Sequence, residues 1–61
     1  MAKGSAKQYP RIEAFNFRPG KLLRGRYEIV TYLGAGWEGE VYLIRERVTG
    51  IERTAKFFFP H

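Results

Sequence analysis

The sequence contains no cysteine, and its single histidine, His61, is the last of 61 residues. Disulfides and thiolate metal sites are therefore excluded, and one terminal histidine does not supply the ligand set of a metal centre. A domain of this length buries only about 60% of the surface that its unfolded chain exposes. Its stability is therefore marginal and has to come from one small apolar core.

Long apolar segments are missing as well. The opening MAKGSAKQYP lacks the apolar stretch of a signal peptide. No later segment approaches the roughly 20 apolar residues that a membrane-spanning helix needs. We therefore expect a cytoplasmic protein without a membrane segment.

Acidic residues are scarce near the start of the chain. Within residues 1–26, Glu13 stands against seven basic residues, namely Lys3, Lys7, Arg11, Arg18, Lys21, Arg24 and Arg26. Residues 27–61 hold four basic and five acidic residues, so the net charge of +5 is the sum of +6 and −1. This asymmetry indicates a flexible basic leader over residues 1–14 and argues against a nucleic-acid-binding domain.

What the sequence does contain is β-strand patterning. Residues 27–33, 40–48 and 52–59 are rich in β-branched and aromatic residues, which is typical of strands. Thr49-Gly50 is a hairpin turn signal between the last two segments. Residues 15–25 add an edge strand that begins with Phe15-Asn16-Phe17, followed by a turn at Arg18-Pro19-Gly20. We predict an all-β fold without helices, an antiparallel meander of three to five strands or a small barrel.

The two-residue period of a strand predicts which side chains share a face. In residues 27–33 it separates two sets, Tyr27, Ile29, Thr31 and Leu33 against Glu28, Val30 and Tyr32. In the last strand it places Lys56 with Thr54 and Phe58. Because both faces of such a meander are apolar, we expect a homo-oligomer that associates through sheet faces or edges. Alternatively, residues 15–23 fold back and close a small barrel.

The segment LGAGWEGEVY, residues 33–42, places three glycines within six positions. A G-x-G-x-x-G pattern opens dinucleotide-binding folds when a helix follows, but here a strand is predicted to follow. Between two strands, such a loop lets backbone N–H groups approach phosphate oxygens, and Lys56 on the next strand supplies a positive charge. Taken alone, the loop is also compatible with a flexible hairpin, and Lys56, taken alone, is more typical of a solvated strand lysine.

Together these features resemble the first three strands of a protein kinase small lobe, with the character of bacterial serine/threonine kinases. Leu33-Gly34-x-Gly36-x-x-Gly39-x-Val41 matches the glycine-rich ATP loop, and a fifteen-residue step leads from Val41 to Lys56, as to the ATP-anchoring lysine of that family. The resemblance makes residues 26–61 a truncated kinase-like small lobe. It implies an ATP site formed by Leu33, Gly34, Ala35, Gly36, Trp37, Glu38, Gly39, Val41, Thr54 and Lys56.

By this resemblance, Leu33 and Val41 line the adenine pocket, residues 34–39 cover the triphosphate, and Lys56 holds the α- and β-phosphates. The sequence departs from the family at Thr54, where a small alanine is usual, and at Glu38, where an aromatic residue is frequent. Because a carboxylate turned inward would repel the phosphates, we expect Glu38 to point outward.

The catalytic aspartate and asparagine of kinases, their metal-binding DFG motif and the helix that carries the lysine's glutamate partner do not occur in this sequence. We therefore expect the amino-terminal fragment of a protein-kinase-like ATP-binding domain, with weak ATP binding or none, no metal site and no phosphoryl transfer. Mg²⁺ and the remainder of the kinase domain would belong to a longer parent protein. The alternatives are a free-standing small β-barrel interaction module and a nucleic-acid binder that stacks bases on Tyr9, Phe15 and Phe17.

Overall fold

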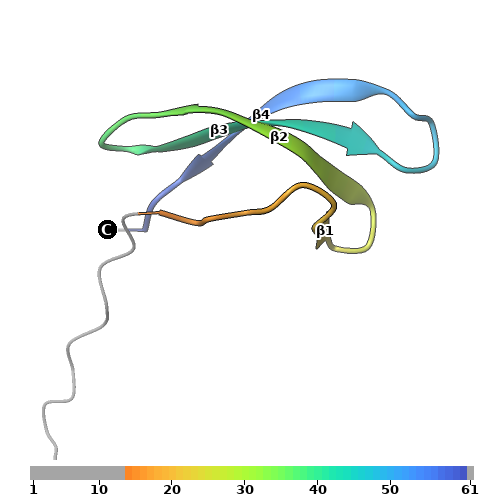
Figure 1. The fold of residues 1–61 in the computed structure, drawn as a ribbon, viewed down its shortest axis with the longest axis horizontal. Helices are drawn as coiled ribbons and strands as arrows, with labels where there is room; N and C mark the ends of the chain where they lie inside the picture. The colour runs from red at the N-terminus through yellow and green to blue at the C-terminus, as the bar shows by residue number, and fades with distance from the viewer. Residues whose placement is uncertain (1–13, 61) are drawn as a thin grey trace, which may run out of the picture.

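The computed structural model describes residues 14–60, which fold into one curled antiparallel sheet without a helix (Figure 1). The four strands, in sheet order, are β1 (Leu22–Leu23), β2 (Tyr27–Ala35), β3 (Gly39–Glu46) and β4 (Glu52–Phe58). Each strand pairs with the next, so the prediction of an all-β antiparallel meander is confirmed. Residues 1–13, which make up most of the predicted basic leader, and His61 lie outside the described residues.

The turns lie where glycine permits a positive φ. The amide of Lys21 donates to the carbonyl of Arg18 at 3.0 Å around Gly20, whose φ is 92°. Between β1 and β2, Arg24 and Gly25 have φ values of 56° and 64°. Two successive positive values are typical of a type I′ turn, which the Arg26 amide closes by donating to the Leu23 carbonyl at 3.1 Å. The predicted turn after Thr49 is confirmed as well, since Gly50 has a φ of 74°.

The edge strand begins later in the chain than the sequence predicts. The paired residues are Leu22–Leu23, whereas residues 15–17 form no ladder. The reason lies in the backbone of Asn16, whose φ of 56° interrupts the extended conformation between two aromatic residues. Asparagine tolerates this left-handed region better than most residues. Phe15 and Phe17 nevertheless lie close together, and their rings stack with centroids 5.2 Å apart.

The face assignment predicted for β2 is wrong beyond Ile29, because the strand carries two register irregularities. Ile29 pairs with Ile44 and Tyr32 pairs with Tyr42, so the step of three residues on β2 matches a step of two on β3. An extra residue of this kind is a β-bulge, which shifts the following side chains to the other face and bends the strand. Tyr32 therefore lies on the Ile29 face, and the sheet curls.

The core lies on the inner, concave face of the curled sheet. Ile29, Tyr42 and Ile44 are buried, with partly buried side chains packed against them, Phe17, Leu23, Tyr27, Ala55 and Phe57. Burying an aliphatic or aromatic side chain of this size contributes roughly 1.5–3 kcal/mol, so a few such residues supply most of the stability of a small sheet. The faces predicted for β4 are correct, since Phe59 is buried and Phe58 is exposed.

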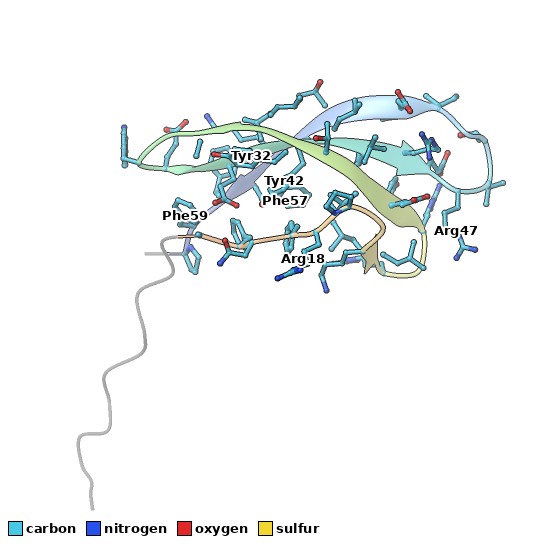
Figure 2. The ribbon with its side chains drawn as sticks, viewed as in Figure 1. Arg18, Tyr32, Tyr42, Arg47, Phe57 and Phe59 are labelled. Carbon is cyan, nitrogen blue, oxygen red and sulfur yellow. The ribbon has the colours of Figure 1, made fainter. Side chains whose placement is uncertain are left out.

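Residues 15–17, here called the strap, cross the inner face and cover it. Phe17 lies 5.3 Å from the rings of both Tyr42 and Phe57, and Phe15 lies 5.2 Å from Phe59. Figure 2 shows Tyr42 and Phe57 between the sheet and the segment that passes beneath it. The alternative prediction that this segment folds back is therefore confirmed. Within residues 14–60 the sheet nevertheless stays open, since β1 and β4 are not neighbours in it.

A buried carboxylate anchors the strap. Glu40 is 5% exposed, and its Oε1 accepts hydrogen bonds from the Tyr42 hydroxyl at 2.7 Å and from the Phe15 amide at 3.1 Å. The same hydroxyl accepts a bond from the Phe17 amide at 3.2 Å. Burying a carboxylate is costly unless such partners compensate for the lost water. The strap is thus attached to β3 by backbone hydrogen bonds as well as by ring packing.

The outer face of the sheet carries a ladder of charges at the end of β2, β3 and β4 that lies farthest from the glycine-rich loop. Arg45 lies between Glu28 and Glu52 in the strand register, 3.7 Å and 2.8 Å from their carboxylate oxygens. Nearby, Arg26 lies 2.6 Å from Glu46. Hydrogen bonds to Glu46 from the Thr49 hydroxyl and from Arg26 lower the pKa of this carboxyl. These exposed pairs favour the observed register but each contributes little stability.

Replacing Tyr42 by phenylalanine tests the anchor. We expect Tyr42→Phe to lower the free energy of unfolding by about 1–3 kcal/mol, because the buried Glu40 and the Phe17 amide both lose a partner. Burial, and then the hydrogen bond to Glu40, raise the pKa of Tyr42 above 10.0. The native hydroxyl therefore stays protonated where the unfolded one ionises, so its contribution is complete below pH 10 and is lost as the pH rises further.

Urea denaturation followed by circular dichroism measures this effect at neutral and alkaline pH. The exposed Tyr32→Phe variant serves as the matched control, and it should lie within about 0.5 kcal/mol of the parent chain. Equal losses in the two variants would show that the Tyr42 hydroxyl does not anchor the strap.

Candidate functional site

The loop between β2 and β3 bounds an open hollow of about 520 Å³ on the outer side of the sheet. Figure 1 shows this loop at the end of the sheet opposite to the β3–β4 turn. The hollow is lined by the residues Leu33, Gly34, Ala35, Gly36, Trp37, Glu38, Gly39, Val41 and Lys56. Of the site residues expected from the sequence, Thr54 is the exception. It is exposed and pairs with Leu43, two positions before Lys56 and away from the hollow's lining.

Strand register brings Lys56 into the hollow. Val41 and Lys56 are direct partners across β3 and β4, so a lysine from one hairpin lies beside the loop of the other. The Lys56 ammonium also lies 5.3 Å from the centre of the Phe58 ring, in a cation–π contact. The fifteen-residue separation between these two positions therefore places a positive charge beside the apolar wall formed by Val41.

The prediction that Glu38 points outward is wrong. Its carboxylate forms an ion pair and a hydrogen bond with the ammonium of Lys56, inside the hollow. The chain bends at Trp37 and Glu38, which removes position 38 from the alternation of the strands. The carbonyl of Glu38 then accepts a hydrogen bond from the Phe59 amide at 2.8 Å, which holds the bend against the end of β4. The expected repulsion between phosphate and carboxylate does not determine where Glu38 points. Its attraction to the ammonium of Lys56 does.

Solvent limits the strength of this pair. The side chains of Lys56 and Glu38 are 42% and 38% exposed. Ion pairs of such exposure contribute about 0.2–1 kcal/mol, and salt screens them. The pair is therefore formed in the structure but can be exchanged for another partner at low cost.

The three glycines of the loop differ in whether the fold has room for a side chain at their positions. A Cβ on Gly39 would lie 2.1 Å from the carbonyl oxygen of Phe57, so β4 approaches the backbone too closely for any side chain. A Cβ on Gly34 or Gly36 would meet no atom within 4 Å, and neither residue has a positive φ. The fold of residues 14–60 therefore requires Gly39 and gives no reason for the other two glycines.

The backbone of the loop is partly committed to its own closure. The Gly36 amide donates to the carbonyl of Gly39 at 2.9 Å, across the tip that holds Trp37. Trp37 itself is 82% exposed beside the hollow. In this arrangement the Gly36 amide is already bonded within the hairpin and does not point a free N–H group at the hollow.

The described part of the chain holds neither a group of metal ligands nor a helix that could span a membrane. Residues 14–60 hold no group of three or more histidine, cysteine, aspartate or glutamate side chains suited to a metal ion. The same residues form no helix of the length and apolar character that crossing a membrane requires. What the site offers chemically is one ammonium, one carboxylate, an apolar wall and a glycine-rich backbone.

Comparison of the chain with models of known protein families gives no match. Comparisons with curated proteins and with solved structures give no significant match either. None of these comparisons therefore bears on the resemblance to protein kinases that the sequence motif suggests.

Alanine substitutions separate the structural glycine from the other two. We expect Gly39→Ala to lower the free energy of unfolding by about 1–3 kcal/mol or more, because β4 has to move away from the new Cβ. Gly36→Ala should leave stability unchanged or raise it by about 0.4–1 kcal/mol through the unfolded chain. Thermal unfolding of both variants measures the difference. Equal destabilisation would mean that Gly36 also has a structural role.

Proposed function

We propose that residues 26–59 are the phosphate-covering part of an ATP-binding domain of the protein kinase class. In this proposal the phosphates of ATP lie in the hollow under residues 34–39, and Lys56 is their counter-ion. The observation that carries it is the direct pairing of Val41 with Lys56, which puts a lysine at the glycine-rich loop. Support also comes from Gly34 and Gly36, two conformationally costly residues for which the fold gives no reason.

The roles of the other residues follow from their places around the hollow. Leu33 and Val41 provide apolar surface for the adenine ring, and Leu33 is 52% exposed and so accessible to a ligand. Thr54 lies outside the lining, so its position does not support a contact with adenine. The cytoplasm remains the proposed compartment, in keeping with the lack of cysteine.

The proposal assigns nucleotide binding, and no catalytic step, to these residues. One lysine and a few backbone donors in an open hollow leave the nucleotide largely in water, which limits how far their contacts can offset the entropy lost on association. We therefore propose a dissociation constant for ATP of about 1 mM or weaker. Mg²⁺ binding and phosphoryl transfer would need groups from the remainder of a longer kinase domain.

Replacing Lys56 by methionine tests the proposed counter-ion. The 61-residue chain should bind ATP with a dissociation constant of about 1 mM, and Lys56→Met should weaken binding about fivefold, the loss of about 1 kcal/mol. Lys21→Met is the matched control, because Lys21 also lies over a phenylalanine ring, at 5.9 Å from Phe17, but outside the hollow.

An NMR titration with ATP followed through the backbone amides of residues 33–41 measures these affinities. Equal affinity of the parent chain and Lys56→Met would contradict the proposal. Low-micromolar binding would mean a far more complete site than the hollow provides.

A second candidate function, an interaction module that self-associates, is favoured by the exposure of apolar side chains around the hollow. Trp37 is 82% exposed, Phe58 64% and Leu33 52%. Because the strap already covers the inner face, a second copy would have to use this outer surface or a free edge of the sheet, at β1 or at β4. The nucleic-acid alternative loses support, since Phe15 and Phe17 pack against the sheet, and Tyr9 lies outside the described residues.

Sedimentation equilibrium at tens of micromolar tests self-association. We expect a dimer or larger species, and Phe58→Ser should shift it toward monomer because it removes apolar contact area from the outer face. Ile51→Ser, at the far end of the sheet and 50% exposed, is the control and should change the distribution little. A purely monomeric parent chain would rule out this candidate.

A further inference from the structure

The carboxylate of Glu38 forms an ion pair with Lys56, the lysine that the proposed function assigns to phosphate. Both side chains line the same hollow, and the ammonium of Lys56 is bonded to Glu38 Oε2. An ammonium is a compact charge that donates to oxygen anions of either kind, carboxylate or phosphate. An entering phosphate therefore finds its counter-ion already paired.

We propose that Glu38 is a built-in competitor of phosphate at Lys56, which sets the affinity of the hollow for polyphosphate ligands and helps to hold the loop against β4. This inference rests on the proposed function. The competition follows from charge: a phosphate must either displace the carboxylate from the ammonium or bind beside it against repulsion. Displacing the Glu38 side chain from Lys56 also breaks one of the contacts that hold the loop against β4.

The backbone explains how the ion pair is connected to the loop's position. The Glu38 carbonyl accepts from Phe59, and the Gly36 amide donates to Gly39, so both sides of the tip are already restrained. The ion pair adds a third restraint, from the loop side chain to the middle of β4. The ion pair is exposed to solvent, whereas the other two restraints are backbone hydrogen bonds. An anion from solution can therefore replace the Glu38 carboxylate in the ion pair.

The competition is weak enough to be reversible. Exposed ion pairs change an equilibrium about 1.5- to fivefold, so removing the carboxylate should tighten polyphosphate binding by the same factor. Added salt should reduce this difference, since it screens the pair.

A double-mutant cycle on the full 61-residue chain tests the proposal, with inorganic triphosphate as the probe and no metal ion present. The variants are Glu38→Gln, Lys56→Met and the two combined, with Glu52→Gln as the control. Glu52 pairs with Arg45 at similar exposure but at the far end of the sheet. Fluorescence of Trp37, which is the sole tryptophan and neighbours Glu38, reports binding.

We expect Glu38→Gln to tighten triphosphate binding about 1.5- to fivefold and Glu52→Gln to leave it unchanged. In the Lys56→Met background, Glu38→Gln should have no effect, because the counter-ion is gone. An equal gain in both backgrounds would mean general electrostatics and would overturn the competition. Without ligand, amide hydrogen exchange at residues 35–38 should be about 1.5- to fivefold faster in Glu38→Gln, and unchanged exchange would overturn the restraint.

These outcomes separate this inference from the proposed function. If the parent chain binds triphosphate through Lys56 but Glu38→Gln binds no tighter, the competition is wrong and the phosphate site stands. If neither the parent chain nor Glu38→Gln shows binding that depends on Lys56, the phosphate site is wrong and the competition falls with it.

Discussion

The rest of the structure depends on the hydrogen bonds that the buried carboxylate of Glu40 accepts from the Phe15 amide and the Tyr42 hydroxyl. A small sheet has two faces, and residues 14–60 contain one segment that covers one of them. The bonds from the Phe15 amide to Glu40 and from the Phe17 amide to the Tyr42 hydroxyl hold the strap on the Ile29 side, where the core lies. A buried charge tolerates few arrangements, because each one that leaves its oxygens without donors is costly. We therefore expect these bonds to favour a single position of the strap as well as to stabilise it.

The same strand connects this anchor to the hollow. Along β3, side chains alternate between the faces, so Glu40 and Tyr42 point inward while Val41 points outward toward the hollow. When the inner pair is held by the strap, the outer position of Val41 and its register with Lys56 are held with it. Core and hollow thus share a backbone, and a change that loosens the strap also loosens the geometry beside the loop.

Much of the fold follows from local patterns in the sequence, whereas the bends do not. The alternation in β3 and β4 and the glycine turns predict the hairpins, and these patterns suffice because both strands are regular. The faces of β2 were assigned wrongly, because a two-residue period does not predict where a bulge adds an extra residue. This extra residue brings Tyr32 onto the Ile29 face. The place of Glu38 was missed for a related reason. A bend at the loop tip ends the alternation, and attraction to Lys56 then determines where the carboxylate lies.

The residues that line the hollow, Thr54 apart, were nevertheless predictable as a group, because strand register brings the loop together with a lysine fifteen positions beyond Val41. What sequence spacing did not reveal is that the glycines divide between two purposes. Gly39 is required by the close approach of β4 to the backbone, a packing constraint that operates without any ligand. Gly34 and Gly36 face open space, so the packing of residues 14–60 does not explain why they lack side chains. The glycines of such a motif therefore have to be divided into those that packing requires and those that it does not, before the motif is used to argue for binding.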